Sequence, residues 1–215
     1  ANVSGQGYCF VAPIRRGSFS DPAGPAPVSP HGDSNQGRAL PPVLARMVGR
    51  DDTVRVIAAD LIADRFVTIV GPGGMGKTTV AVAVAHAITS EFAGMVYLVD
   101  LGALTDPKLL AATVASTLGL TIQTEEPLPA LMRCLRLTRM LLVLDNCEHV
   151  VEASAPLAEL IFNEAPGVHI LATSREALRV EGEHVYWLPP LESPPPDSSL
   201  SAVDVLNFPA VKLFV

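Results

Sequence analysis

Apolar residues in this chain fall into short continuous runs that alternate with longer segments of helical periodicity. Strands that are apolar throughout and separated by helices are typical of a parallel sheet covered on both faces. The sequence therefore predicts an α/β fold with a mostly parallel five-stranded sheet and helices on both of its faces. The runs that predict strands are FVTIV at 66–70, MVYLVD at 95–100, MLLVLD at 140–145, HILAT at 169–173 and HVYWL at 184–188.

The segments between these runs have the spacing and the end signals of helices. Residues 51–64 place apolar side chains on one helical face and begin with acidic residues, which the helix dipole favours. Residues 106–119 begin at Asp106, a capping residue followed by proline, and end at Gly119. Further helices are predicted at 77–90, 128–136 and 148–166. Pro156 predicts a kink or break in the last of them.

Composition divides the chain into four regions. Residues 1–14 alternate glycine with aromatic and small residues and predict a short β-ribbon, whose partner strand we expect upstream because a lone ribbon is unstable in water. Residues 15–44, rich in proline, glycine and serine, predict a linker. The α/β domain is expected at 45–192. Residues 193–215 read as a second linker and the start of a helical element that the chain end truncates.

Charge and cysteine usage narrow the class of protein. The net charge of −7 argues against a basic nucleic-acid surface over the chain as a whole. The three cysteines are widely spaced and contain no CxxC pair, which indicates neither a disulfide framework nor a zinc site. No apolar run approaches the ~18 to 20 residues that span a bilayer, and no signal peptide is recognisable. We therefore expect a soluble cytoplasmic protein.

A glycine-rich segment between the first strand and its helix matches the pattern G-x-x-x-x-G-K-[ST]. Glycines allow left-handed torsions and bring backbone N–H groups close to phosphate oxygens. Lys77 supplies a charge for the β- and γ-phosphates, and the Thr78 hydroxyl can ligate Mg²⁺. We expect the amides at 71–79 to bind a nucleotide, the alternative being a turn that binds nothing. The residues concerned are Gly71, Gly73, Gly74, Met75, Gly76, Lys77, Thr78 and Thr79.

A triphosphate site needs a metal-holding carboxylate on a neighbouring strand, and Asp145 ends the predicted strand at 140–145. Such a carboxylate is costly to bury unless a cation or donors compensate it, although an Asp there can also cap the next helix. Many P-loop ATPases have a second acid at the next position to orient the attacking water. Asn146 would do that poorly, so Glu148 is the substitute candidate, or an ordinary acidic residue of a helix's first turn.

Arg175 follows the fourth predicted strand and is expected at the carboxyl edge of the sheet, where open parallel sheets bind ligands. From there it could reach a γ-phosphate and sense its presence. The alternative is a surface salt bridge.

Four segments, MVGRDDTV, GPGGMGKTT, LLVLDNCEHV and ILATSREAL, together resemble the nucleotide-binding domain of the STAND ATPases, the NB-ARC-like group of P-loop NTPases found in bacterial transcriptional regulators. The resemblance covers about residues 45–192. It implies ATP or ADP with Mg²⁺ as ligands. The roles it implies are Val48, Gly49 and Arg50 over adenine and ribose, Lys77 and Thr78 on phosphate and Mg²⁺, Asp145 as the Walker B acid, and Arg175 as the sensor arginine.

The same resemblance implies a switch between an ADP-bound closed form and an ATP-bound open form able to self-associate. Asn146 departs from the frequent second acid, which predicts slow or no hydrolysis. The helical domains that close over the nucleotide in that group are expected beyond Val215. A catalytically active P-loop ATPase or kinase is the alternative, and a vestigial P-loop is disfavoured by the intact Lys77, Thr78 and Asp145.

The segment VSGQGYCFVAP at 3–13 resembles the last hairpin of a winged-helix DNA-binding domain of the response-regulator type. The recognition helix would then lie upstream of Ala1. The resemblance implies DNA binding only through that missing upstream part, and no membrane partner is expected.

Overall fold

The computed structural model describes residues 40–42, 47–120, 126–195 and 201–214. The chain divides into two units, residues 1–34 and 35–215, and every element below belongs to the second. The β-ribbon predicted at 1–14 and most of the linker predicted at 15–44 lie outside the described residues. In the described ranges, no helix is both long and apolar enough to cross a membrane.

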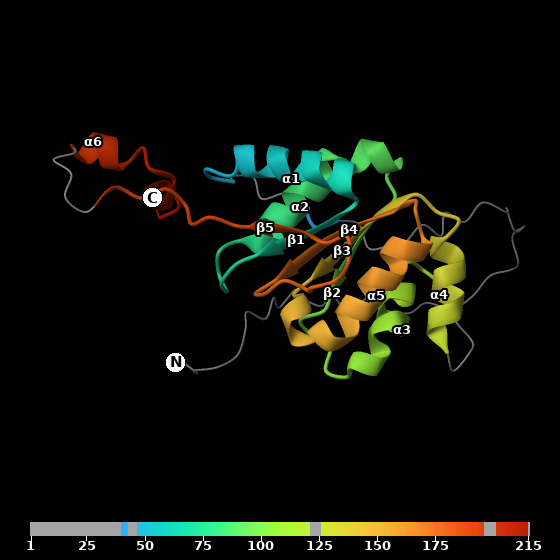
Figure 1. The fold of residues 1–215 in the computed structure, drawn as a ribbon. Helices are drawn as coiled ribbons and strands as arrows, with labels where there is room; N and C mark the ends of the chain where they lie inside the picture. The colour runs from blue at the N-terminus through green and yellow to red at the C-terminus, as the bar shows by residue number, and fades with distance from the viewer. Residues whose placement is uncertain (1–39, 43–46, 121–125, 196–200, 215) are drawn as a thin grey trace, which may run out of the picture. The chain divides into compact units, whose positions relative to one another are not determined.

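Five strands form one sheet in the order β2-β3-β4-β1-β5 (Figure 1). All four strand pairings are parallel, so the predicted α/β fold with a five-stranded parallel sheet is confirmed. The carboxyl ends of the strands consequently meet at one edge of the sheet. The strands are β1 Phe66–Val70, β2 Val96–Asp100, β3 Met140–Asp145, β4 Val168–Ser174 and β5 His184–Trp187.

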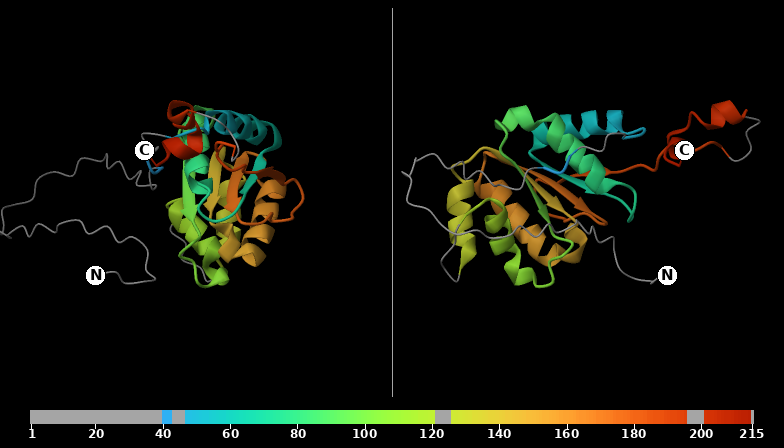
Figure 2. Two further views of the ribbon diagram at one scale, coloured as in Figure 1. Left: turned by 90° about the vertical axis from the view of Figure 1, so that its left-hand side faces the viewer. Right: turned by 180° about the vertical axis from the view of Figure 1, so that it is seen from behind.

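Helices cover both faces of this sheet, as predicted (Figures 1 and 2). On one face lie α1 (Asp51–Asp64) and α2 (Lys77–Ala87), and on the other lie α3 (Leu110–Thr117), α4 (Pro127–Leu135) and α5 (Val151–Glu164). Three short 3₁₀ turns, Thr89–Phe92, Pro107–Leu109 and Cys147–His149, and two short helices, α6 Ala202–Val205 and α7 Pro209–Lys212, complete the described elements.

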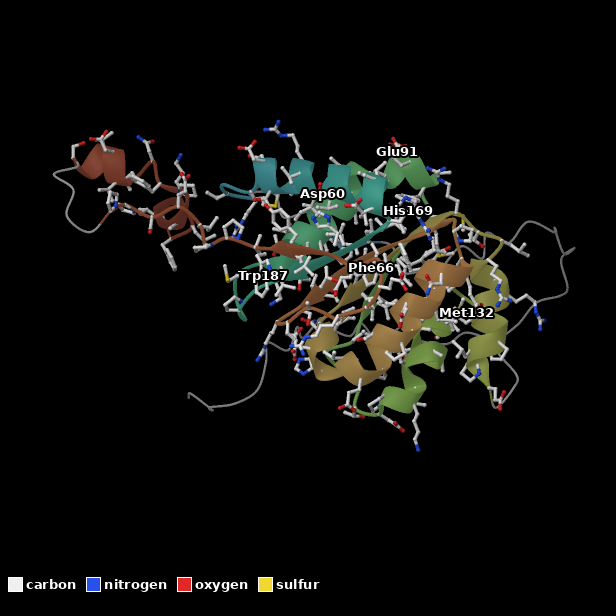
Figure 3. The ribbon with its side chains drawn as sticks, in the orientation of Figure 1. Asp60, Phe66, Glu91, Met132, His169 and Trp187 are labelled. Carbon is white, nitrogen blue, oxygen red and sulfur yellow. The ribbon has the colours of Figure 1, made fainter. Side chains whose placement is uncertain are left out.

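Successive side chains of β3 pack into two separate cores. Leu141 and Val143 of β3 pack with α1 and α2, whereas Leu142 and Leu144 pack with α3, α4 and α5. This alternation follows from the two-residue period of a strand, and it requires both faces to be apolar. Figure 3 shows the side chains of both cores, with Phe66 and Met132 on the α3–α5 side.

The predicted ends of the helix at 106–119 are largely confirmed. The Asp106 carboxylate accepts the N–H of Lys108 at 3.0 Å, and Gly119 follows the helix with a φ of +74°. The first turn is a 3₁₀ turn rather than part of the α-helix, so the capping residue precedes Pro107–Leu109 and α3 begins one turn later.

Of the kink or break predicted at Pro156, the break is wrong, because α5 continues through this residue to Glu164. Proline at the sixth helical position removes one backbone donor near the amino end of the helix. Beyond it, Leu157, Ala158 and Ile161 are buried against the sheet, and this packing holds the remaining turns in place.

Gly167 precedes β4, where the chain passes close to the segment before β3. A Cβ atom at this position would lie 2.6 Å from the carbonyl oxygen of Thr138 and 3.3 Å from the Cα of Arg139. Because both atoms belong to the backbone, Gly167→Ala must displace the start of β3 from β4. We expect it to lower the free energy of unfolding by about 1 to 3 kcal/mol, measured by urea denaturation.

The matched control is Asn163→Ala, an exposed position near the end of α5 before the same connection, which should stay within about 0.5 kcal/mol of the parent. Equal stability of Gly167→Ala and the parent would show that the two segments are not in the close contact described.

Candidate functional site

The glycine-rich segment forms the loop between β1 and α2, at the carboxyl edge of the sheet. Gly74 and Gly76 have φ angles of +80° and +84°, in the left-handed region that glycine adopts without strain. The Gly71 N–H donates to the Ser174 carbonyl at 3.3 Å, which ties the start of the loop to β4. Since α2 begins at Lys77, the loop leads into a helix amino end, whose unpaired N–H groups favour an anion.

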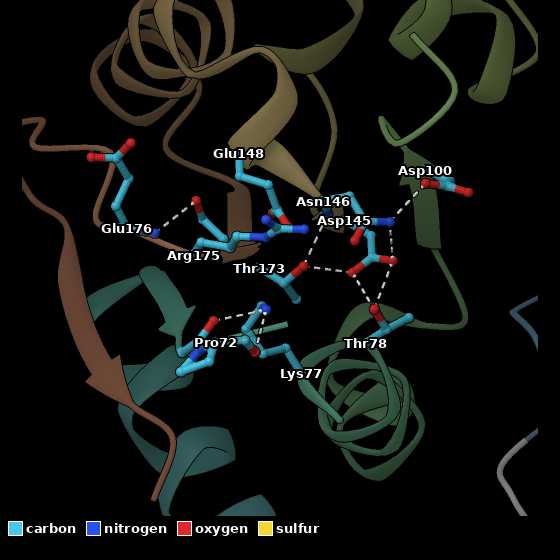
Figure 4. A network of polar contacts seen from close by, with 12 residues as sticks. Pro72, Lys77, Thr78, Asp100, Asp145, Asn146, Glu148, Thr173, Arg175 and Glu176 are labelled. Atoms are coloured by element: carbon cyan, nitrogen blue, oxygen red, sulfur yellow. Dashed lines mark hydrogen bonds and ion pairs between the residues drawn. The ribbon is translucent and has the colours of Figure 1, made fainter. Parts of the chain in front are cut away.

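Lys77 lies inside this loop (Figure 4). Its Nζ donates to the carbonyl oxygens of Gly71 at 2.9 Å and Pro72 at 3.2 Å, and the residue is only 7 % exposed. The ammonium group is therefore held over the backbone of the loop that the sequence predicts as the phosphate site.

Thr78, the next residue, contacts Asp145 at the end of β3. Its hydroxyl lies 2.9 and 3.0 Å from the two carboxylate oxygens. The expectation that this carboxylate stands on a strand next to β1 is wrong, because β4 lies between β1 and β3. The contact forms nevertheless, since α2 packs across both β3 and β4 and carries Thr78 over the intervening strand.

The intervening strand supplies a third member of the cluster. The Thr173 hydroxyl donates to Asp145 Oδ1 at 2.5 Å and accepts the N–H of Asn146 at 3.0 Å. Thr173 ends the predicted strand at 169–173, but the sequence indicates no role for it. Its signal was a polar side chain at the end of an otherwise apolar strand, and only the strand order shows which carboxylate it meets.

Asn146 links Asp145 to a second aspartate that the sequence reasoning missed. Its Nδ2 donates to Asp100 Oδ1 at 3.0 Å and to Asp145 Oδ2 at 3.2 Å. Asp100 ends β2 and pairs in register with Asp145 across the sheet. The available signal was that the two predicted strands MVYLVD and MLLVLD both end in aspartate.

Asp145 is a buried residue, only 3 % exposed. Burial raises its pKa above the usual value, the hydrogen bonds from Thr173 and Thr78 oppose that rise, and the negative charges of Asp100 and Glu148 add to it. The site thus holds a buried carboxylate beside two further acids. A bound cation would offset this accumulation of negative charge.

Glu148 and Arg175, the two remaining catalytic candidates, form an ion pair with each other. Arg175 Nε lies 3.1 Å from Glu148 Oε1, with the arginine side chain 62 % exposed and the glutamate 11 %. The other oxygen, Oε2, is buried and has no hydrogen-bond partner among the described residues. The salt bridge weighed as the alternative for Arg175 therefore exists. The guanidinium also borders the P-loop, because a Cβ on Gly73 would lie 3.8 Å from Nη2.

A cavity of about 500 Å³ opens beside the loop. Its walls combine the segment before α1, the P-loop with the start of α2, the chain after β5, and residues of and after α7. They are formed by Met47, Val48, Arg50, Gly74, Met75, Gly76, Thr79, Val80, Pro190, Leu191, Ala210, Leu213 and Phe214. The cavity therefore brings Val48 and Arg50 together with the P-loop residues Met75 and Thr79.

Arg50 holds two walls of the cavity together. Its guanidinium donates to the carbonyl oxygens of Pro189 at 2.7 Å and Met75 at 3.3 Å, and its burial lowers its pKa. Gly49 does not line the cavity directly but has a φ of +66°, and a Cβ there would lie 2.5 Å from Pro209 Cβ.

The C-terminal segment was expected to begin a helical domain whose closing parts lie beyond the chain. In the structure this segment already reaches the site, because Ala210, Leu213 and Phe214 line the cavity and the Ala210 N–H donates to the Glu192 carbonyl at 3.0 Å. A short helix beginning at Pro209 is sufficient to form this wall.

The donor chemistry of the cluster fits magnesium, since a threonine hydroxyl and a carboxylate are the hard oxygen ligands that this ion prefers. In the part of the chain that the structure describes, no group of three or more His, Cys, Asp or Glu residues is arranged to hold a metal ion. Magnesium here would therefore complete its shell with phosphate oxygens and water, as it commonly does beside nucleotides.

Comparison with known proteins shows the family to which this chain belongs. Residues 62–180 match the family model described as AAA domain, and they span β1 to the loop after β4. A Mycobacterium tuberculosis protein named as an HTH-type transcriptional regulator is 40 % identical over 130 residues, which cover 60 % of this chain and 14 % of that protein. An uncharacterised protein of the same species is 34 % identical over 149 residues, covering 69 % of this chain and 38 % of its own length.

Two solved structures share the fold at low sequence identity. Cdc6p from Pyrobaculum aerophilum has a TM-score of 0.52 and 16 % identity over 67 % of this chain and 46 % of its own. A Signal Transduction ATPase with Numerous Domains (STAND) protein with a tetratricopeptide repeat sensor, from Pyrococcus horikoshii, has a TM-score of 0.50 and 20 % identity over 72 % and 25 %. The chain thus spans well under half the length of the two mycobacterial relatives described.

The family model covers more than half of the chain and includes the P-loop, Asp145 and Arg175. With a glycine-rich loop before α2, a buried carboxylate at the end of β3 and an all-parallel sheet, the chain belongs to the AAA domain family of P-loop ATPases.

Proposed function

We propose that this domain binds ATP and ADP with Mg²⁺ and serves as a STAND-type nucleotide switch in a multidomain transcriptional regulator, with slow or no hydrolysis. The observation that carries the proposal is the convergence of Lys77, Thr78 and Asp145 at one loop, beside a largely apolar cavity of nucleoside size. The four sequence segments typical of STAND proteins support the finer assignment.

The phosphate chain is assigned to the loop amides at 71–79 and to Lys77. On binding, the Lys77 ammonium exchanges the carbonyl oxygens of Gly71 and Pro72 for phosphate oxygens, which are stronger acceptors because they are charged. Thr78 and Asp145 hold the magnesium ion, which supplies neutralising charge for the β- and γ-phosphates when bound. Thr173 keeps the carboxylate aimed at this position.

The base and ribose are assigned to the cavity. Val48 and Arg50 contribute its wall, Gly49 allows Pro209 to approach, and Arg50 joins the loop to the chain after β5. Because Ala210, Leu213 and Phe214 close part of the same wall, occupancy of the cavity would bias the position of the C-terminal segment.

Slow hydrolysis is supported by the partners of the candidate catalytic groups. The Asn146 amide is engaged by two carboxylates and cannot act as a base. Glu148 is paired with Arg175, so it cannot orient a water freely while Arg175 remains beside it. Arg175 could leave Glu148 for a γ-phosphate, which would let the pair report whether ATP or ADP is bound.

The wider setting of the domain is part of this proposal. Residues 1–14 are assigned to the end of a winged-helix domain, 15–44 to a linker, 45–192 to the nucleotide-binding domain, and 193–215 to a linker and the start of a helical domain. A relative named as an HTH-type transcriptional regulator and a STAND protein of the same fold support this setting. DNA would be contacted only through the winged-helix part, and self-association would accompany the ATP form in the cytoplasm.

Titration calorimetry with Mg²⁺-ADP and Mg²⁺-ATP tests the proposal directly. We expect binding of both nucleotides by the parent chain, a loss of at least about tenfold in affinity for Lys77→Ala, and no appreciable steady-state turnover. Lys108→Ala, which removes a lysine at the start of the 3₁₀ turn before α3, is the control and should bind normally. Unchanged affinity in Lys77→Ala would reject the phosphate site, and robust turnover would favour an enzyme over a switch.

The Glu148–Arg175 pair predicts opposite effects for its two members. Arg175→Ala should weaken ATP binding roughly tenfold more than ADP binding, because a charged donor to the γ-phosphate is lost. Glu148→Gln should improve ATP binding relative to ADP about two- to fivefold, since Arg175 no longer has a charged partner. Competition titrations of the two nucleotides measure this ratio.

Arg179→Ala is the matched control, since Arg179 forms an exposed ion pair with Glu176 in the same connection after β4. It should leave the ratio of ATP to ADP affinity unchanged. If Arg175→Ala weakened both nucleotides equally, Arg175 would not be a sensor of the γ-phosphate.

The contribution of the cavity to nucleotide binding can be distinguished from that of the phosphate loop by filling the cavity. Ala210→Trp should lower ADP affinity at least about tenfold, because the indole occupies space needed by the nucleoside, while binding of inorganic tripolyphosphate remains. Val203→Trp, at a 71 % exposed position in α6, is the control and should bind ADP normally. Full ADP affinity in Ala210→Trp would place the base elsewhere.

A further inference from the structure

Two carboxylates from neighbouring strands share one amide group in this site. Asn146 Nδ2 lies 3.0 Å from Asp100 Oδ1 and 3.2 Å from Asp145 Oδ2, so each of its two hydrogens has an acidic acceptor. Both hydrogens of the amide are therefore engaged, one by the exposed Asp100 and the other by the buried Asp145. In Figure 4 Asp100 lies on the opposite side of Asp145 from the Glu148–Arg175 pair.

The backbone also favours asparagine at this position. Residue 146 has a φ of +61°, a left-handed conformation that asparagine adopts more readily than most other residues with a side chain. An acid here would place a third carboxylate against Asp100 and Asp145 without a donor between them. The departure from a second acid thus has a structural reason in the presence of Asp100.

Asp100 is itself held in place. Its Oδ1 also accepts the N–H of Gly102 at 2.9 Å. A Cβ on Gly102 would lie 3.1 Å from this oxygen and 3.2 Å from Asn146 Nδ2, so the turn after β2 packs closely against the shared amide. Because the backbone turn fixes the Asp100 carboxylate, this carboxylate can in turn orient the Asn146 amide that donates to it.

The orientation matters most once a metal is bound. The Thr78 hydroxyl, which contacts both oxygens of Asp145, would then turn to the cation. Among the donors described, Thr173 remains on Oδ1 and Asn146 on Oδ2. Groups that hydrogen-bond to a metal ligand without touching the metal orient that ligand. Their loss typically weakens metal binding about tenfold to a hundredfold.

We propose that Asp100 is a positioning residue for magnesium: by accepting the Asn146 amide, it fixes the Asp145 carboxylate in the orientation that binds the cation. The inference rests on the proposed nucleotide site. In this proposal Asp100 is not a metal ligand, because its Oδ1 already accepts the Asn146 amide and the Gly102 N–H. Its role is that of a hydrogen-bond acceptor rather than of a negative charge.

The test compares ADP affinity with and without Mg²⁺ by titration calorimetry. Asp100→Ala should reduce the gain in affinity that Mg²⁺ provides by about tenfold, while metal-free ADP binding stays within about twofold of the parent. Asp100→Asn keeps an oxygen acceptor for Asn146 and Gly102, so it should retain the gain within about threefold. Asp106→Ala is the control, because Asp106 accepts an N–H two residues ahead in the same way but away from the site.

A double-mutant cycle identifies the route of the effect. Asn146→Gly removes the amide at a backbone conformation that glycine tolerates, and it should reduce the Mg²⁺ gain as much as Asp100→Ala does. The double variant should show no further loss, because both changes break the same chain of hydrogen bonds from Asp100 through Asn146 to Asp145. Thermal unfolding of each variant, followed by far-ultraviolet circular dichroism, verifies that the domain remains folded.

The outcomes separate this inference from the function on which it rests. A full Mg²⁺ gain in Asp100→Ala, or an equal loss in Asp100→Asn, would overturn the positioning role while nucleotide binding stands. Additive losses in the double variant would also contradict it. Absence of ADP binding by the parent chain would instead remove the nucleotide site, and with it this inference.

Discussion

The buried carboxylate of Asp145 is the constraint around which the site is organised. Ionising the carboxyl group of a residue that is only 3 % exposed, at the end of an apolar strand, is costly without donors or a cation. Thr78, Thr173 and Asn146 provide the donors from three different elements. They bring α2, the end of β4 and the turn after β3 into one cluster, at the edge of the sheet where all five strands end.

The strand order determines which residues can take part. Because β4 lies between β1 and β3, the P-loop and Asp145 are not on adjacent strands, and Thr173 occupies the position between them. On the far side of β3 lies β2, which brings Asp100 to the same height as Asp145. The carboxylate therefore has one polar neighbour on each flanking strand, a hydroxyl on one side and, through Asn146, an acid on the other.

The P-loop borders two regions of different chemistry. One holds charged groups, with the Glu148–Arg175 pair and the acids around Asp145, whereas the other is a cavity with mainly apolar walls. A phosphate chain and an aromatic base would need this division. Arg50 joins two walls of this cavity, since it donates to the carbonyl of Met75 in the loop and to that of Pro189 after β5.

The sequence alone determined the α/β fold, the strand bounds to within a residue or two, and the P-loop with Lys77 and Thr78, because these depend on local periodicity and on residue types at fixed spacing. Asp145 was recognisable as a carboxylate at a strand end. Its partner Thr173, its link through Asn146 to Asp100, the pairing of Glu148 with Arg175, and the cavity wall at Ala210 were not, since they join residues far apart in the chain. Periodicity gives no strand order, and only the tertiary structure, by inserting β4 between β1 and β3, decided which polar side chains meet.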